Sequence, residues 1–360
     1  MNRLLIGMDA LGHNYRTVGT WIGHHGAALT VVTKALCGHE QVLGSLARIG
    51  ATSVADSRLE NLRVISDMGL ELECWYLRPP HSSELEEVVR LADVSLNTEL
   101  STVKDLDSAA GRLGYRHKVL LMIELGDLRE GILPGALVRT YQEVFTLPNV
   151  DIIGIGANLG CLAGAIPSID QLMQLVLYRE LLELKFDRKL PFISAGSSAV
   201  LPLLLEGQVP PAVNHFRVGE AILLGTDLIN GGTLGGLRND GFLLEAEVVE
   251  VKEKSLTPLG ETSDEISPFG TGNGSDPDIA PGSRGFRAVV TVGELDTDVS
   301  SLVPVNPEYR IAGASSDVTV LNVGEHGSSL SVGDTVSFRM GYSGLVRLMN
   351  NRYTEKVIVD

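Results

Sequence analysis

The chain has 360 residues, of which 44% are hydrophobic, and it carries a formal net charge of −16. This length predicts one large domain or two, and the negative charge makes nucleic acids and other polyanions poor partners. No run of about 18 apolar residues occurs, and Asp9 interrupts the short apolar patch at the start, so we expect neither a membrane span nor a signal peptide, but a cytoplasmic protein.

Short β-rich runs alternate with helical patterns over the first two thirds of the chain. The pattern predicts eight strands, at residues 28–35, 52–58, 72–78, 93–97, 117–125, 150–159, 191–198 and 215–224. Segments between them, such as SELEEVVRLA and SIDQLMQLVLYRELLELKF, have the apolar spacing of amphipathic helices. Eight such repeats in a length near the usual ~250 residues favour an α/β fold with a (β/α)8 TIM-type barrel. A doubly wound open sheet is the alternative, and only the count of eight decides against it.

The composition changes after about residue 232. The glycine-rich segment GGTLGGLRNDG leads into β patterns such as FLLEAEVVEVKE, GFRAVVTVG and DTVSFRMGY, with no long amphipathic helix. We therefore expect the barrel over residues 1–232 and a C-terminal all-β domain over residues 233–360. Residues 259–285 are rich in Gly, Pro, Ser and Asp, and we expect a long flexible or functional loop there.

Polar residues occur where the predicted strands end. In a barrel of this kind the carboxyl ends of the strands face the active site. Each polar residue taken singly has an alternative role as an ion pair or a cap on a loop, but their coincidence at nearly every strand end predicts a site. The positions are Lys34, Asp56, Ser57, Arg78, Asn97, Glu124, Arg129, Asn158, Ser197, Ser198, Arg217 and Gly219.

Lys34 stands at the end of a buried strand, where a lysine is rarely found without a partner. A partly desolvated amine can form a Schiff base with an aldehyde, and pyridoxal 5'-phosphate (PLP) is the commonest aldehyde cofactor. The turns GSSA (196–199) and RVGEA (217–221) offer N–H groups, and Ser198 a hydroxyl, for its phosphate. Arg217 is placed to face the ring nitrogen. An arginine there keeps that nitrogen unprotonated, which favours return of a proton to Cα over transamination.

These and further motifs resemble the PLP-dependent fold-type III racemases, most closely the alanine/ornithine racemase group, near the ornithine racemases. The resemblance implies an amino-acid racemase that uses PLP and acts on ornithine or another basic amino acid such as lysine or arginine, with alanine or serine as the alternative. It also implies a head-to-tail homodimer in which each β-domain closes its partner's active site. The motifs run in order over almost the whole chain: VVTKALCGHE, SVADSRLENLR, ADVSLNTEL, LLMIELGDLREGI, IGIGANLGC, ISAGSSAVL, FRVGEAILLG and IAGASSDVTV.

The resemblance also implies individual roles. Lys34 corresponds to the Schiff-base lysine, which acts as one of two bases, and Arg129 to the arginine that supports the lysine and the substrate carboxylate. Arg217 matches the arginine on the pyridine nitrogen, and Asn158 replaces a histidine beside the PLP ring. The implied phosphate-binding positions are Ser197, Ser198, Gly219 and Glu220, with Tyr353 as a further ligand. Asp317 lies in the loop that contacts the partner's substrate.

The second catalytic base departs from the family pattern. Alanine racemases supply a tyrosine from a GYADG motif, where this chain reads VGELDTD and Glu294 stands near the tyrosine's position. Racemisation needs an acid or base on each face of Cα. The candidates are Cys161, Cys37, Asp317 and Glu294. A thiolate would serve if neighbouring cations favoured it, and small-residue packing is the alternative role for both thiols.

Other interpretations stay open. Glu124, Asp127, Glu220 and Glu294 are candidates to hold the distal ammonium of a basic substrate or to pair with local cations. A PLP-binding homeostasis protein without turnover is one alternative, but it needs no domain after residue 232. A lyase or dehydratase is another, but it adds a metal site built from His and Cys in the β-domain. That domain contains His326 and no cysteine, and the three cysteines of the chain have no metal-like spacing, so we expect no metal.

Overall fold

The structure is a computed structural model that describes residues 2–160, 162–258, 260, 282–324 and 329–360. The predictions for Cys161, His326 and most of the 259–285 loop lie outside the described residues. The chain divides into two compact units, Gly12–Arg238 and a second unit that joins Met1–Leu11 to Asn239–Asp360. This division differs from the expected one at both ends of the barrel. The first strand pairs with C-terminal strands and therefore belongs to the β unit.

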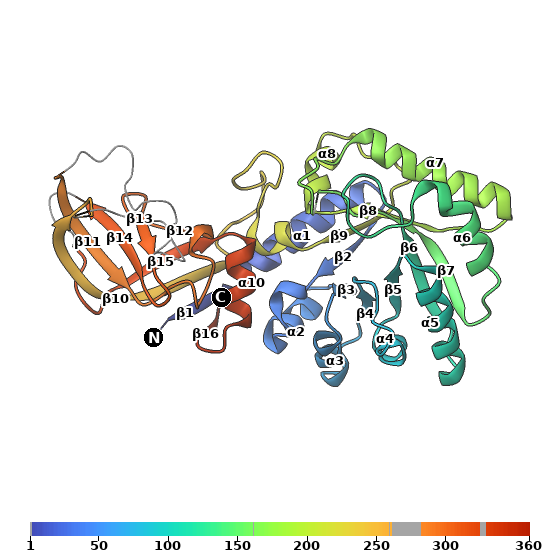
Figure 1. The fold of residues 1–360 in the computed structure, drawn as a ribbon, viewed down its shortest axis with the longest axis horizontal. Coiled ribbons are helices and arrows are strands. Elements are labelled where there is room, and N and C mark those ends of the chain that lie inside the picture. The colour runs from blue at the N-terminus through green and yellow to red at the C-terminus, as the bar shows by residue number, and fades with distance from the viewer. Residues whose placement is uncertain (1, 161, 259, 261–281, 325–328) are drawn as a thin grey trace. The chain divides into compact units, whose positions relative to one another are not determined.

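The Gly12–Arg238 unit is built on a closed barrel of eight parallel strands (Figure 1). The last strand pairs with the first in the register Ala28↔His215 to Val31↔Val218, which confirms the predicted TIM-type barrel and excludes an open sheet. The strands are β2 (Ala28–Val32), β3 (Ser53–Asp56), β4 (Glu73–Tyr76), β5 (Val94–Asn97), β6 (His117–Met122), β7 (Val150–Gly156), β8 (Phe192–Gly196) and β9 (His215–Val218).

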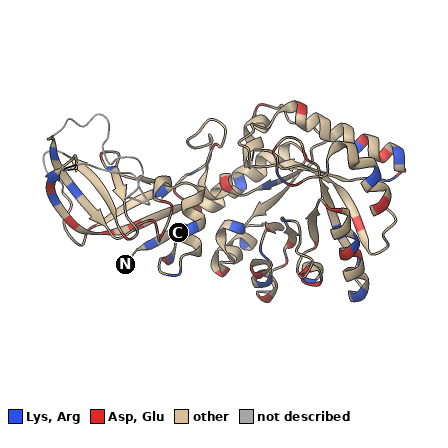
Figure 2. Cartoon of the chain, in the orientation of Figure 1, with Lys and Arg blue, Asp and Glu red and all other residues tan. Residues whose placement is uncertain are grey.

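Helices alternate with these strands and lie outside the barrel (Figure 1). Most charged residues of this unit lie on the helices and loops (Figure 2), whereas an apolar cluster that includes Trp75, Leu96, Leu120 and Met122 fills the strand layer. The helices are α1 (Met8–His24), α2 (Glu40–Arg48), α3 (Leu59–Asp67), α4 (Leu85–Leu91), α5 (Leu100–Leu113), α6 (Leu137–Val144), α7 (Ile169–Phe186), α8 (Leu201–Leu205) and α9 (Glu220–Leu224), with short 3-10 turns η1 (Lys34–Leu36), η2 (Pro134–Ala136) and η3 (Ser198–Val200).

Seven of the eight predicted strands end earlier than the sequence suggests, by two to six residues. β6 stops at Met122, β7 at Gly156 and β9 at Val218, whereas the predicted runs continue to residues 125, 159 and 224. The apolar run after Gly219 forms α9, because a short apolar run does not by itself distinguish a buried strand from a buried helix.

The β unit is an antiparallel sheet with one parallel pair. β1 (Arg3–Gly7) pairs antiparallel with β10 and parallel with β16 (Glu355–Val359). The 14-residue strand β10 (Phe242–Ser255) also pairs with β11 (Arg284–Val290) and β15 (Thr335–Met340). β12 (Leu302–Pro304), β13 (Arg310–Ala314) and β14 (Thr319–Gly324) complete it.

The β unit is not free of helix, since α10 (Tyr342–Asn350) follows β15 and buries Leu345 and Leu348. A short 3-10 turn, η5 (Val299–Ser301), precedes β12. Arg284 and Gly285, expected in the long loop, already belong to β11. Among the described residues, no helix is long and apolar enough to cross a membrane.

Candidate active site

Lys34 begins the 3-10 turn that follows β2, and its side chain is half-buried. A buried carboxylate on the next strand fixes this turn. The Thr33 hydroxyl donates to Asp56 Oδ2 at 3.0 Å, and Asp56 also accepts from Asn61 Nδ2 at 3.0 Å and from the Arg58 N–H at 2.9 Å. Burial raises the pKa of Asp56, and these hydrogen bonds oppose that rise. Asp56 is therefore a support of the lysine turn.

Two further predicted residues lie near Lys34. Cys37 ends its turn with a positive φ of 51°, and its Sγ lies 3.6 Å from the Ala35 carbonyl oxygen. Glu220 is half-buried, and its pKa is raised by burial, while a hydrogen bond with Thr226 and the charge of Lys34 oppose the rise. A carboxylate from the turn after β9 thus contributes to the electrostatic environment of the lysine.

Arg217 lies on β9, with 7% of its surface exposed. Nη1 donates to the Ser194 carbonyl oxygen at 2.8 Å and also to the Ser194 hydroxyl. Nη2 donates to the Ala157 carbonyl oxygen and to Asn158 Oδ1, both at 3.0 Å. The hydrogen bonds that Arg217 forms with the described residues come from Nη1 and Nη2, so Nε–H is the donor left for a ligand.

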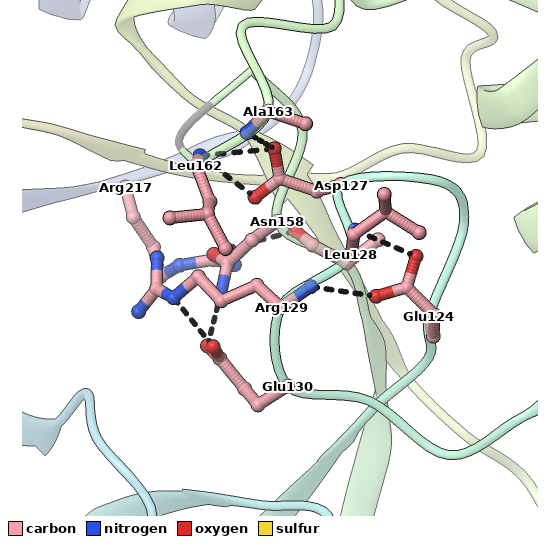
Figure 3. A network of polar contacts seen from close by, with 10 residues as sticks. Glu124, Asp127, Leu128, Arg129, Glu130, Asn158, Leu162, Ala163 and Arg217 are labelled. Carbon is pink, nitrogen blue, oxygen red and sulfur yellow. Dashed lines mark hydrogen bonds and ion pairs between the residues drawn. The ribbon is translucent and has the colours of Figure 1, made fainter.

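Glu130 joins two of the predicted residues, although the sequence analysis did not single it out. Arg129 Nε lies 2.5 Å from Glu130 Oε2, and Asn158 Nδ2 donates to Glu130 Oε1 at 2.5 Å. Because Asn158 also accepts from Arg217, the four side chains form one network (Figure 3). Burial lowers the pKa of Arg217 to about 10, Glu130 opposes this, and Arg129 adds to it.

Two other acidic residues near this network bind backbone N–H groups. Glu124 accepts from Leu128 and Arg129 at 3.2 and 3.1 Å, and it shapes the loop that carries Arg129 (Figure 3). Asp127 is 2% exposed and accepts from the N–H groups of Leu162 and Ala163. Their carboxylates therefore order the chain around Arg129, which weakens their case as ligands of a distal ammonium.

The turns after β8 and β9 contact each other. Ser198 Oγ accepts from the Ala221 N–H at 3.1 Å, and the buried Ser197 Oγ has no hydrogen-bond partner among the described residues. A Cβ at Gly219 would lie 3.0 Å from Val32 Cβ and 3.1 Å from the Val32 carbonyl oxygen. A Cβ at this position would therefore push the turn away from β2.

The β unit carries the remaining candidates. Glu294 and Leu295 donate their N–H groups to the carbonyl oxygens of Ser315 and Ser316, so the loops that carry Glu294 and Asp317 lie side by side. Glu294 Oε2 lies 3.6 Å from Arg347 Nη1. The Asp317 side chain is exposed and accepts from the Ser316 hydroxyl at 2.5 Å.

Tyr353 also lies in the β unit and is 71% exposed. Its hydroxyl accepts from Arg352 Nη2 at 2.6 Å, and the Arg352 guanidinium stacks 4.8 Å from the ring centroid. Its expected contact with a phosphate stays a prediction.

Comparison with known proteins identifies the family of this chain. The family model described as "Alanine racemase, N-terminal domain" matches residues 6–227. The chain belongs to this family. It is 35% identical over 358 residues to the ornithine racemase of Acetoanaerobium sticklandii, covering 99% of each chain. It is 33% identical over 355 residues to the lysine racemase of Thermotoga maritima, covering 99% of this chain and 98% of that one.

Solved alanine racemases share the fold of this family member. The alanine racemase of Streptomyces coelicolor A3(2) superposes with a TM-score of 0.76 at 19% identity, covering 100% of this chain and 98% of that one. The resemblance stated from the motifs is thus confirmed. Within the barrel, the structure brings Arg129, Asn158 and Arg217 into one network, through Glu130. The sequence signal for Glu130 was its place directly after Arg129 in GDLREG.

Proposed function

We propose that this protein is a PLP-dependent racemase of basic amino acids such as ornithine and lysine. The observation that carries the proposal is the pairing of β2 with β9. This pairing sets a buried, donor-only arginine on β9 next to β2, whose following turn carries the half-buried lysine. Relatives named ornithine racemase and lysine racemase, alike over nearly the full chain, support the substrate class.

The residues present fit PLP. Lys34 supplies the amine for covalent attachment, and the unpartnered Ser197 hydroxyl, with Ser198 and the Gly219 turn, supplies donors for a phosphate. Arg217 Nε–H is the remaining donor for the ring nitrogen. When bound, PLP supplies an electron sink that makes the Cα–H of an amino acid acidic.

The chain's own groups then move protons and hold the substrate. Lys34 takes or returns the Cα proton on one face, and Arg129, clamped by Glu130, holds the substrate carboxylate. A second group acts on the opposite face, for which Cys37, Cys161, Glu294 and Asp317 remain the candidates. Because Arg217 donates and cannot accept, it leaves the ring nitrogen unprotonated, which favours reprotonation at Cα.

The test follows exchange at Cα. PLP-loaded protein is incubated in D2O with L-ornithine, L-lysine, L-arginine, L-alanine and L-serine, and chiral chromatography and mass spectrometry report D-product and deuterium. We expect both with the basic substrates, and loss of both in Lys34→Ala. Lys104→Ala, which removes an exposed lysine paired with Glu143, is the matched control. Bound PLP without any D-product would instead support the homeostasis alternative.

We also propose a cytoplasmic, head-to-tail homodimer with shared active sites. The test mixes inactive Lys34→Ala with Glu294→Gln or with Asp317→Asn under conditions that exchange subunits. If the β unit of one subunit completes the barrel site of the other, one site in each mixed dimer is intact and activity returns. No recovery, together with a monomeric mass in solution, would refute the shared site.

A further inference from the structure

A line of buried polar side chains runs from Arg217 across the barrel interior. Arg217 Nη1 donates to the Ser194 hydroxyl, and Ser194 Oγ lies 2.6 Å from His215 Nδ1. His215 Nε2 lies 2.8 Å from Thr30 Oγ1, which lies 2.8 Å from Ser53 Oγ. Ser194 is 0% exposed and His215 is 1% exposed. Each of these groups therefore depends on its neighbours for hydrogen bonds.

Arg217 determines which group donates and which accepts in each hydrogen bond of this line. A guanidinium only donates, so the Ser194 oxygen accepts from Arg217. Among the described residues, Ser194 Oγ has only His215 as a second partner, so its own hydrogen goes to Nδ1. Nδ1 is then the acceptor, the ring proton sits on Nε2, and Nε2–H donates to Thr30.

The opposite tautomer would leave a buried group unsatisfied. With the proton on Nδ1, both neighbours would donate to the Ser194 oxygen, and the Ser194 hydrogen would have no acceptor among the described residues. An unpaired buried hydroxyl destabilises the fold, so the packing selects Nε2–H.

The ring of His215 is also held in place and uncharged. It stacks on Trp75 with centroids 4.3 Å apart and planes at 21°, and Phe192 packs edge-on at 5.6 Å. Burial, and then the charge of Arg217, lower the pKa of His215 to about 3. Around neutral pH the histidine is therefore a neutral acceptor beside the positively charged Arg217.

We propose that His215, fixed as the Nε2–H tautomer, is a positioning residue that orients the Ser194 hydroxyl and thereby sets the plane of the Arg217 guanidinium. His215 does not reach the substrate and acts through Ser194. The consequence for catalysis rests on the proposed function, because it assumes that Arg217 Nε–H meets the cofactor ring. The tautomer itself depends only on the protein.

The direct test is NMR of the full-length holoprotein labelled with 13C and 15N in histidine. Comparison with His215→Gln assigns the ring. We expect the Nε2–H tautomer without change between about pH 5 and about pH 9. An Nδ1–H tautomer, or an imidazolium at pH 5, would overturn the proposal.

A pair of serine variants tests the effect on Arg217. Ser194→Ala removes the linking hydroxyl, whereas Ser95→Ala removes the matched hydroxyl bonded to His117 Nε2 at 2.8 Å, with no arginine attached. We expect Ser194→Ala to lower kcat by roughly tenfold with little change in KM, since a hydrogen bond to a charged group is lost. We also expect it to shift the absorbance maximum of bound PLP and to remove the tautomer preference of His215.

Ser95→Ala should leave the absorbance maximum and kcat close to those of the unaltered protein. If the two variants behave alike, with PLP bound and the fold intact, His215 does not position Arg217. If Ser194→Ala does not fold, the NMR measurement on the unaltered chain still decides the tautomer. Absence of racemisation in the unaltered protein would refute the proposed function and leave the tautomer result standing.

Discussion

Replacing Glu130 by glutamine tests the network that joins the two active-site arginines. Glu130 presents one carboxylate oxygen to Arg129 Nε and the other to Asn158 Nδ2, each at 2.5 Å. Glutamine keeps the size of the side chain but offers one oxygen and one NH2 group. The NH2 group of the glutamine then meets the N–H of either Arg129 or Asn158, so two donors face each other and one hydrogen bond is lost.

The expected loss follows from burial. The Glu130 side chain is 15% exposed and that of Arg129 is 31% exposed, so solvent screens the pair only in part. A hydrogen bond to a charged group contributes about 1.5–3 kcal/mol, and about 1.4 kcal/mol corresponds to a tenfold change in rate. We therefore expect Glu130→Gln to lower kcat/KM by about 10- to 100-fold.

The pH profile should change as well. Burial lowers the pKa of Arg217 to about 10, and the negative charge of Glu130 limits that fall. We expect activity to fall at alkaline pH as Arg217 loses its proton. Removing the charge of Glu130 lowers the pKa of Arg217 further, so this fall should begin at a lower pH in the variant.

The assay is kcat/KM for ornithine racemisation from neutral to alkaline pH, with Glu180→Gln as the matched control. Glu180 also follows its arginine directly, with Arg179 Nη2 at 2.7 Å, but its side chain is 59% exposed on α7. An exposed pair of this kind contributes about 0–1 kcal/mol, so the control should keep its activity. Equal activities and equal alkaline limbs in the two variants would refute the reasoning.

Two further predictions concern the turn at Gly219 and the buried histidines. Gly219→Ala should weaken PLP binding at least tenfold by absorbance titration, because its Cβ would lie 3.0 Å from Val32. The control Gly23→Ala, whose Cβ has nothing within 4 Å, should leave the affinity unchanged. Unchanged affinity in Gly219→Ala would contradict this reasoning. Burial lowers the pKa of His215 to about 3 and that of His117 to about 4, so the unfolded state binds more protons below pH 6.5 and stability falls as the pH falls. At about 1.4 kcal/mol per pH unit for each histidine, urea unfolding at pH 4.5 should give a free energy of unfolding about 5 kcal/mol lower than at pH 7. His117→Gln should lose about half of this pH dependence. A free energy of unfolding that does not fall between pH 7 and pH 4.5 would refute the prediction.

The eight barrel strands could be predicted because each is a short apolar run between polar helical patterns. Their ends were harder to place, as at β7, where the apolar pattern continues past Gly156 while the chain leaves the sheet to present Asn158. β1 gave no local sign of its partners. Its pairing with β10 and β16 joins residues more than 200 positions apart, which periodicity does not report.

The candidate site likewise contains residues that the sequence predicts and residues that only the fold reveals. Lys34 and Arg217 were predictable because a charged residue at the end of a buried strand is rare. Glu130 was not, because an acidic residue in a loop is common and only the fold brings its carboxylate between Arg129 and Asn158. His215 begins β9 directly after Asn214, and only the closure of the barrel places it against Ser194 and Thr30.

The contacts of Arg217 explain why an arginine suits this position. Its burial has a large desolvation cost, and no carboxylate within the described part of the chain forms a hydrogen bond or ion pair with it. Glu130 is linked to it through Asn158. Four neutral acceptor atoms on Ser194, Ala157 and Asn158 stabilise the charge instead, and each of the two amino groups of the guanidinium donates to two of them. A lysine has a single ammonium group with three donors and could not satisfy these four acceptors on β8 and directly after β7. The guanidinium therefore keeps its positive charge and a fixed orientation. Both are needed for it to donate to a ring nitrogen that acts as an acceptor.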